Sequence, residues 1–243
     1  MIKENDRVLL IGEKREFFVR AGEGDLSTDK GIIKLADLTG LDTGDIVKTH
    51  LGVSFKIRIP RPVDFFSYAK RTGAPMLPKD IGTVIAYTGM NKKDRVLDAG
   101  TGSGVAAIFF GSVAGFVDTY EIREEFSKIC AKNIADAGLE NVRVNAGDFL
   151  SVESDEKYDV IHLDMQIEKE HVKHAYGLLK TGGYLATYTP FLEQTFNVMD
   201  AAEDLFSEVV CHELIGRELS RTKRGTRPST RVCHTGYITI CRK

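Results

Sequence analysis

The chain has 243 residues, 42% hydrophobic and 28% charged, which is an ordinary composition for a globular protein with a substantial core. A formal net charge of −2 argues against indiscriminate nucleic-acid binding, and no apolar run is long enough to span a bilayer. The four cysteines, Cys130, Cys211, Cys233 and Cys241, have no metal-ligand spacing. We therefore expect a cytoplasmic protein with reduced thiols, no bound metal and no membrane partner.

Residues 1–60 predict short strands separated by turns that contain glycine. The predicted strands are Arg7–Ile11, Glu16–Val19, Gly31–Lys34, Asp45–Thr49 and Phe55–Ile59. Each is rich in β-branched or aromatic residues, which favour strands. The pattern indicates a small all-β domain, either a barrel or a sandwich. Pro60 and Pro62 would interrupt strand pairing, so residues 61–77 are predicted to be a linker on the substrate side.

From Pro78 to the end of the chain, predicted strands alternate with predicted helices in a second domain, residues 78–243. The strands are Arg95–Leu97, Gly115–Glu121, 141–149, Tyr158–Met165, Gly182–Pro190, Ser207–Glu213 and Gly236–Arg242. The helices are Asp80–Gly89, Glu124–Gly138, one around Lys173–Leu179, and Glu193–Leu205. This alternation predicts a parallel sheet with helices on both faces and ligands at the carboxyl ends of its strands. Cys130 falls on the apolar face of its helix, which indicates core packing.

The loop after the first strand of this domain, Asp98–Gly104, has glycine at every second position from Gly100 onward. Glycines at that spacing let the backbone turn sharply and approach a ligand closely. Dinucleotide sites have the spacing G-x-G-x-x-G. The spacing here is G-x-G-x-G with an acid two residues before it, and this is typical of S-adenosylmethionine-dependent methyltransferases.

Three further carboxylates follow predicted strands of the same sheet. Glu121 ends the second strand, where it can accept both ribose hydroxyls of a nucleoside, and the alternative is a solvated acid. Asp148 can accept a hydrogen bond from the adenine amino group while Phe149 offers the ring an apolar face, and the alternative is a turn aspartate. Asp164 would lie beside the reactive sulfonium, and the alternative is a helix cap. All these acids are predicted at one edge of the sheet.

Two clusters of basic residues stand out on a chain that is slightly acidic overall. The first comprises Arg217, Arg221, Lys223, Arg224, Arg227 and Arg231, with Glu218 as the one acid among them. The second comprises Lys56, Arg58, Arg61, Lys70, Arg71 and Lys79 around the aromatic residues Phe65, Phe66 and Tyr68. Either cluster alone could be solvated surface. Together they favour a partner that carries phosphates.

Several segments resemble the tRNA adenine-N1 methyltransferases that modify the T-loop, in particular the archaeal members. They are residues 71–104, 120–134, 158–165, 178–190 and 227–243, and the most diagnostic are Pro78–Lys79–Asp80 and His234–Thr235–Gly236–Tyr237. The resemblance implies a Rossmann-like class I methyltransferase domain with a mostly parallel seven-stranded sheet, behind a small β-barrel-like N-terminal domain. It also implies S-adenosylmethionine as cofactor, tRNA as partner and a homotetramer.

The predicted site follows from the residue pattern and this resemblance together. The cofactor-binding set is Asp98, Gly100, Thr101, Gly102, Ser103, Gly104, Glu121, Ile122, Asp148, Phe149 and Asp164. Asp164 is also the predicted catalytic residue, because it would accept a hydrogen bond from the exocyclic amine of a flipped-out adenine. N1 of adenine is already unprotonated, so no strong base is needed and alignment supplies much of the acceleration.

The chain departs from the family pattern on the predicted substrate side. Ala74–Leu77 stand where the family usually has Gln-Ile-(Val/Ile)-(Tyr/His), Met165–Glu168 replace Leu-Pro or a similar pair, and Glu193 replaces asparagine. Two alternatives therefore stay open. One is a methyltransferase with a small-molecule or protein acceptor. The other is a non-catalytic tRNA-binding subunit, although an intact glycine loop argues against it.

Overall fold

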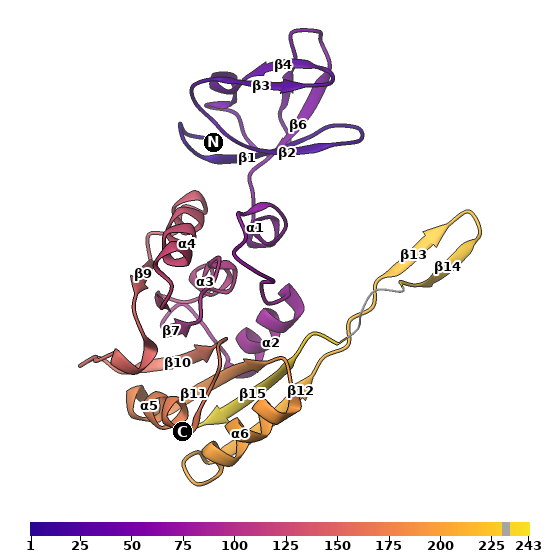
Figure 1. The fold of residues 1–243 in the computed structure, drawn as a ribbon. Coiled ribbons are helices and arrows are strands. Elements are labelled where there is room, and N and C mark those ends of the chain that lie inside the picture. Colours follow the sequence, from indigo (N-terminus) through magenta and orange to yellow (C-terminus); the bar gives the residue numbers. More distant parts are fainter. Residues whose placement is uncertain (230–233) are drawn as a thin grey trace.

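The computed structural model describes residues 1–229 and 234–243, and its N-terminal part is a small β unit (Figure 1). Four strands form an antiparallel sheet in the order β2-β1-β6-β5: β1 Arg7–Ile11, β2 Glu16–Arg20, β5 Ile46–Lys48 and β6 Ser54–Arg58. The strands β3 (Asp25–Thr28) and β4 (Gly31–Lys34) pair as a hairpin, followed by the 3-10 helix η1 (Leu35–Leu38). Side chains such as Val8, Leu10 and Phe55 enclose a separate apolar core. The small β domain predicted from the sequence is thus present.

The segment predicted as a linker contains a helix, α1 (Pro62–Tyr68). Pro62 occupies the first turn, where its missing N–H is no loss, and Asp64 accepts a hydrogen bond from the Arg61 N–H at 2.8 Å. Strand pairing does stop before these prolines, because β6 ends at Arg58, but the sequence did not predict the helix that begins at Pro62. Proline ends the strand before it and at the same time begins a helix.

The N-terminal unit is attached to the rest of the molecule through polar and aromatic contacts. Arg7 pairs with the Asp136 carboxylate at 2.6 Å, and Arg20 pairs with the other oxygen of that carboxylate. The Phe18 ring packs edge-on against Phe65 at 5.4 Å between centroids. These contacts join β1 and β2 to α1 and α4 (Glu124–Asp136).

The larger unit is built on a seven-stranded sheet in the order β12-β15-β11-β10-β7-β8-β9. Its strands are β7 Arg95–Ala99, β8 Phe116–Glu121, β9 Val142–Ala146, β10 Tyr158–Leu163, β11 Leu179–Thr189, β12 Glu208–Glu213 and β15 Tyr237–Arg242. The strands β7 to β11 pair in parallel, whereas β15 runs antiparallel to both β11 and β12. This is the mostly parallel sheet that the sequence predicted.

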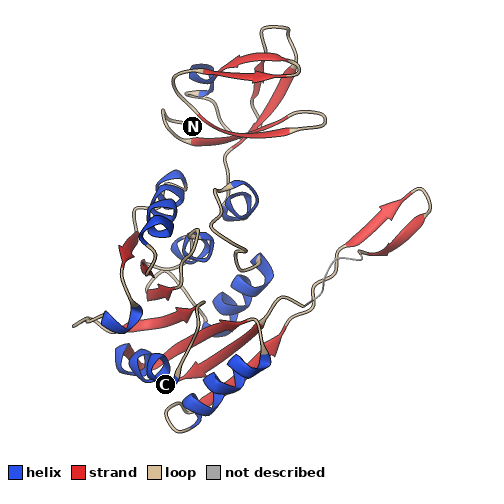
Figure 2. Cartoon of the chain, viewed as in Figure 1, coloured by secondary structure: helices blue, strands red, loops and turns tan. Residues whose placement is uncertain are grey.

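Helices cover both faces of this sheet, and Figure 2 shows them gathered around it while strands dominate the N-terminal unit. One face carries α2 (Pro78–Thr88), α3 (Val105–Gly111) and α4, with a core that includes Val84, Ile108 and Cys130. The other carries α5 (Lys169–Leu178) and α6 (Leu192–Glu203), and the 3-10 helix η2 (Phe149–Ser151) packs beside them. The predicted core role of Cys130 is confirmed, because its side chain is fully buried.

A two-stranded hairpin that the sequence did not predict projects from the sheet (Figure 1). It consists of β13 (Leu219–Thr222) and β14 (Gly225–Pro228), and every residue of both strands is exposed. We call residues 217–229 the arm. Among the described residues, no helix is long and apolar enough to cross a membrane.

Candidate functional site

The glycine loop lies where the sequence places it, between β7 and α3. Gly100, Gly102 and Gly104 have φ angles of +82°, +53° and +81°, which favour glycine. A Cβ atom at Gly100 would lie 2.0 Å from the carbonyl oxygen of Asp164, and one at Gly104 would lie 2.7 Å from the Sγ atom of Cys130. Glycine is therefore required at these two positions both by backbone conformation and by space.

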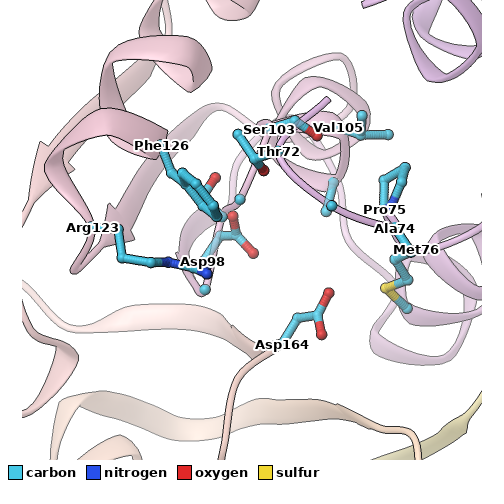
Figure 3. Close-up of a pocket in the computed structure, with 15 residues that line it drawn as sticks. Thr72, Ala74, Pro75, Met76, Asp98, Ser103, Val105, Arg123, Phe126 and Asp164 are labelled. Atoms are coloured by element: carbon cyan, nitrogen blue, oxygen red, sulfur yellow. The ribbon is translucent and has the colours of Figure 1, made fainter. Parts of the chain in front are cut away.

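Two cavities meet around this loop, and together they are lined by every predicted cofactor-binding residue except Gly104. The loop cavity, of about 190 Å³, is lined by Thr72, Gly73, Ala74, Pro75, Met76, Asp98, Gly100, Thr101, Gly102, Ser103, Val105, Ala106, Arg123, Phe126 and Asp164 (Figure 3). The strand-end cavity, of about 290 Å³, is lined by Ala99, Gly100, Tyr120, Glu121, Ile122, Arg123, Gly147, Asp148, Phe149, Asp164, Met165 and Gln166. Gly100, Arg123 and Asp164 line both cavities. One elongated ligand could therefore occupy the two.

Asp98 is buried at the base of the loop cavity, and its carboxylate is held from two sides. Thr119 donates its hydroxyl to Oδ2 at 2.6 Å, and the other oxygen, Oδ1, is 2.7 Å from Nδ1 of His162. All three side chains come from neighbouring strands of the sheet. The carboxylate orientation is consequently fixed before any ligand arrives.

Glu121 is held by the loop and by a residue that the sequence reasoning missed, Arg123. The Gly102 N–H donates to Glu121 Oε2 at 2.9 Å, and Arg123 Nε donates to Oε1 at 2.8 Å. Burial by itself would raise the pKa of Glu121, but the hydrogen bonds from Arg123 and Gly102 outweigh burial and lower that pKa below its ordinary value. The Arg123 guanidinium also lies over the Phe126 ring, 3.9 Å from its centroid. Arg123 could have been predicted as a partner of Glu121, because it follows that strand-end acid by two residues.

The residues predicted to surround an adenine line the strand-end cavity with different degrees of exposure. Asp148 is exposed, and its carboxylate accepts a hydrogen bond from the Leu150 N–H at 3.1 Å, as a helix cap does. Phe149 is buried, and its ring is stacked against His171 at 6.3 Å between centroids. Ile122 is 68% exposed at the cavity rim. Asp148 therefore both caps the turn that follows it and lines the strand-end cavity.

Asp164 lies at the junction of the two cavities, directly after β10. Figure 3 shows its carboxylate pointing into the loop cavity, between Asp98 and Met76. Its backbone N–H donates to the carbonyl of Ala99 at 2.9 Å, but its carboxylate makes no hydrogen bond to another described residue. Burial raises the pKa of this carboxyl to about 6, and the nearby Asp98 adds to the rise while His162 opposes it. A carboxylate without a protein partner is available to a ligand.

The two most diagnostic sequence motifs meet at the root of the arm, although they are far apart in the chain. Lys79 Nζ donates to Asp80 Oδ1 at 2.5 Å, to the Leu214 carbonyl at 2.8 Å and to the Thr235 hydroxyl at 2.7 Å. Thr235 in turn donates to Asp80 Oδ2 at 2.8 Å, across 155 residues of sequence. The Tyr188 ring packs against Gly236 so closely that a Cβ atom there would lie 2.5 Å from it. We call Lys79, Asp80, Leu214 and Thr235 the clamp.

Breaking the clamp is expected to destabilise the fold. Asp80 is fully buried, so the variant Asp80→Ala leaves the Lys79 ammonium without its counter-ion in a partly buried position. Lys79 keeps some contact with water, so the free energy of unfolding should fall by about 2–4 kcal/mol, toward the lower end for buried ion pairs. Urea denaturation would measure it. Glu213→Ala, which removes the half-exposed pair with His234, is the control and should leave the unfolding free energy nearly unchanged.

The positions that depart from the family pattern fall into two groups. Ala74, Pro75 and Met76 line the loop cavity, and Met165 and Gln166 line the strand-end cavity, so these substitutions change the walls of the site. The remaining departures lie elsewhere: Leu77 precedes the first turn of α2, Ile167 is buried in the core, Glu168 caps α5 and Glu193 is exposed on α6. The altered part of the site is thus concentrated around Asp164.

The two basic clusters have different surroundings. In the cluster at 56–79, Lys79 belongs to the clamp, Phe65 is buried, and Tyr68 stacks on Phe18 at 5.6 Å between centroids. In the other cluster, Arg231 lies outside the described residues, as does Cys233. The described cysteines Cys130, Cys211 and Cys241 are free thiols. No group of three or more His, Cys, Asp or Glu side chains among the described residues is placed to hold a metal ion.

Comparisons with known proteins agree on one class of enzyme. A family model described as a methyltransferase domain matches residues 90–226. The tRNA (adenine(57)-N(1)/adenine(58)-N(1))-methyltransferase of Methanocaldococcus jannaschii is 32% identical over 96% of this chain and 94% of its own length. The tRNA (adenine(58)-N(1))-methyltransferase of Thermus thermophilus is 30% identical over 72% of this chain and 70% of its own length.

Two solved structures extend the similarity over the whole chain. A structure described as an S-adenosylmethionine-dependent O-methyltransferase from Thermotoga maritima has a TM-score of 0.86 at 30% identity, covering 100% of this chain and 94% of that one. The tRNA (m1A58) methyltransferase of Aquifex aeolicus has a TM-score of 0.80 at 26% identity, covering 100% of this chain and 98% of that one. The fold, including the N-terminal β unit, is therefore shared with both.

Proposed function

The chain belongs to the tRNA (adenine-N1)-methyltransferase family, and we propose on that basis that it methylates N1 of an adenosine in the T-loop of tRNA with S-adenosylmethionine. The observation that carries the proposal is the position of Asp164. Its unpartnered carboxylate lies where the loop cavity and the strand-end cavity join, which is where the sulfonium of a cofactor that spans both cavities would lie.

The residues around the two cavities fit S-adenosylmethionine. Asp148, Phe149 and Ile122 line the strand-end cavity and would hold the adenine, while Glu121 would accept the ribose hydroxyls. Asp98, Thr101 and Ser103 line the loop cavity together with Gly102, beside space for the amino-acid end. Gly100 and Gly104 let the loop pack closely against Asp164 and Cys130, because neither position has room for a side chain. When bound, the cofactor supplies an electrophilic methyl group on a positively charged sulfur.

The chemistry asks little of the protein beyond alignment and charge. N1 of adenine carries a lone pair at neutral pH, so no general base has to remove a proton first. Asp164 would accept a hydrogen bond from the exocyclic amine, and that bond strengthens as positive charge develops on the ring. A charged Asp164 therefore stabilises the transition state more than the bound substrate, which is the condition for acceleration.

The proposal also covers the methyl acceptor, a tRNA, and the oligomeric state. The target adenine must leave its stack to reach Asp164, so the partner is a folded tRNA whose base is flipped. We infer a cytoplasmic homotetramer from the resemblance to the family. The division into residues 1–60, 61–77 and 78–243 is supported by the separate apolar core of the N-terminal unit.

The test is methyl transfer to tRNA. The protein is incubated with labelled S-adenosylmethionine and bulk tRNA, and the nucleosides are then separated. Label in 1-methyladenosine is the expected result. Cofactor binding with unlabelled tRNA would overturn the proposal, and tRNA binding without cofactor binding would point to a non-catalytic subunit.

A second candidate function is methylation of an oxygen or nitrogen on a small molecule or protein. It is favoured by the likeness to the Thermotoga maritima O-methyltransferase and by the altered walls at Ala74, Met76 and Met165. A hydroxyl acceptor would need a base to take its proton, and Asp164 is the carboxylate at the junction. Label in a small-molecule fraction of a cell extract, with none in RNA, would support this function.

A further inference from the structure

The Glu121 carboxylate already accepts as many hydrogen bonds as a carboxylate can. Its Oε1 atom accepts from the Arg123 backbone N–H at 3.1 Å and from Arg123 Nε at 2.8 Å. Its Oε2 atom accepts from the Gly102 N–H at 2.9 Å and from Arg123 Nη2 at 3.3 Å. Two oxygens offer about four lone-pair sites, and these bonds fill them. A ribose can therefore reach this carboxylate only if one of the donors leaves.

The donor that can leave is the Arg123 guanidinium. The other two donors are backbone N–H groups, one in the glycine loop and one at the N-cap of α4, so they move only if the chain moves. The Arg123 side chain is 53% exposed, whereas that of Glu121 is 1% exposed. Release of the guanidinium would keep one backbone bond on each Glu121 oxygen and open one site on each. A ribose has two neighbouring hydroxyls, which match these two sites.

The surroundings of Arg123 allow its guanidinium to let go of Glu121. Arg123 lines both cavities, so it lies where a ligand that spans them would pass. Its guanidinium lies over the Phe126 ring, 3.9 Å from the centroid, and Figure 3 shows the two side chains together at the wall of the loop cavity. This cation–π contact does not depend on Glu121, so it can hold the displaced cation. Displacement then costs an ion pair with a half-exposed partner and strands no buried charge.

We propose that Arg123 competes with the ribose hydroxyls of the cofactor for the Glu121 carboxylate, so that binding exchanges two guanidinium hydrogen bonds for two hydroxyl hydrogen bonds. This assignment rests on the proposed function for its choice of a ribonucleoside cofactor, and it goes beyond that function by giving Arg123 a role that opposes binding. The product S-adenosylhomocysteine carries the same ribose as the cofactor. Return of the guanidinium to Glu121 therefore helps to release the product after methyl transfer.

The first test compares two variants that each remove one cation. Arg123→Ala removes the competitor, and Lys128→Ala removes an exposed cation of α4 that pairs with Glu124 and lies outside the lining of both cavities. Calorimetric titration measures the affinity of each variant for S-adenosylhomocysteine. Arg123→Ala is expected to bind it about threefold to tenfold more tightly, because the ligand no longer has to break an ion pair. Lys128→Ala should match the wild type.

The second test asks whether the competition acts through the hydroxyls. Adenosine is compared with dideoxyadenosine, which has the same base and lacks both neighbouring ribose hydroxyls, by NMR titration. Arg123→Ala should strengthen the binding of adenosine by the same factor as that of S-adenosylhomocysteine, and it should leave the binding of dideoxyadenosine unchanged. Arg123→Lys keeps the charge but not the planar fork that bonds both Glu121 oxygens, so its gain in affinity should be smaller.

Several results would overturn the proposal. Weaker binding of S-adenosylhomocysteine by Arg123→Ala would make Arg123 a ligand of the cofactor and not its competitor. Equal gains for adenosine and dideoxyadenosine, or an equal gain in Lys128→Ala, would show that the hydroxyls are not involved. If Arg123→Ala fails to fold, Arg123→Lys decides by the same comparison. A wild type that binds S-adenosylhomocysteine but forms no 1-methyladenosine would count against the proposed reaction, whereas the titrations measure Arg123 alone.

Discussion

Replacing Asp164 with alanine is expected to reduce methyl transfer by at least about a hundredfold, the usual cost of losing one group that stabilises transition-state charge. Affinity for S-adenosylhomocysteine should stay within about tenfold, because in the proposed reaction the carboxylate binds the acceptor base and the other cofactor-binding residues are unchanged. Radiolabel transfer to tRNA and calorimetric titration measure the two quantities. Asp155→Ala, the same chemical change in an exposed residue before β10, is the control and should have wild-type activity.

The pH dependence of methyl transfer tests the role of Asp164 independently. Burial raises the pKa of Asp164 to about 6 in the unliganded protein, so the carboxylate loses its charge as the pH falls through that value. The ratio kcat/KM, which reports the free enzyme, should therefore be level above pH 7 and fall about tenfold for each pH unit well below 6. Asp164→Asn should lack this acid limb. Full activity of Asp164→Ala, or an acid limb that persists in Asp164→Asn, would remove the assigned role.

Gly100→Ala is expected to weaken cofactor binding strongly. The new methyl group would lie 2.0 Å from the Asp164 carbonyl oxygen, so either the loop or the end of β10 has to move. The left-handed backbone at φ +82° adds its own penalty for alanine. Overpacking of this kind costs about 1–3 kcal/mol beyond the backbone penalty. Affinity for S-adenosylhomocysteine should fall by at least about thirtyfold, with a lower unfolding midpoint.

A matched variant separates the clash from the backbone penalty. Gly182 has φ +81°, and a Cβ atom built there meets nothing within 4 Å. Gly182→Ala therefore carries the same conformational cost without a clash, and it lies before the second half of β11, away from both cavities. It should lower stability by about 1–2 kcal/mol and leave cofactor affinity unchanged. Equal effects of the two variants would show that crowding at Gly100 is unimportant.

The sequence located these acids well because each lies at the carboxyl end of a strand: Asp164 directly follows β10, Glu121 is the last residue of β8, and Asp98 is the last but one of β7. Asp98, Glu121 and Asp164 were each placed at the edge where they are found, since parallel strands must align their carboxyl ends. The same logic located the glycine loop. What the pattern did not contain was how these acids are partnered. Asp98 is hydrogen-bonded to Thr119 in the core, the Glu121 carboxylate accepts a hydrogen bond from Arg123, and the Asp164 carboxylate has no partner among the described residues.

The features that escaped prediction depend on contacts between distant residues. The clamp joins Asp80 to Thr235 across 155 residues, and no local pattern indicates such a bond. The arm was hidden for a different reason: its strands carry cations and small polar residues, with no alternation of apolar and polar side chains. For α1, Pro62 was interpreted by its effect on strands, although proline is also favoured in the first turn of a helix.

The antiparallel course of β15 has a consequence for how this enzyme can change over evolutionary time. Because β12 and β15 pair directly with each other, everything between them is an excursion from a hairpin, and its length does not affect the register of the sheet. Lengthening such a loop costs little, about 0.6 kcal/mol for each doubling. The segment between β12 and β15 can therefore be exchanged or resized while the parallel strands β7 to β11 and the glycine loop keep their places. The architecture thus allows this segment to diverge without disturbing the two cavities beside the glycine loop.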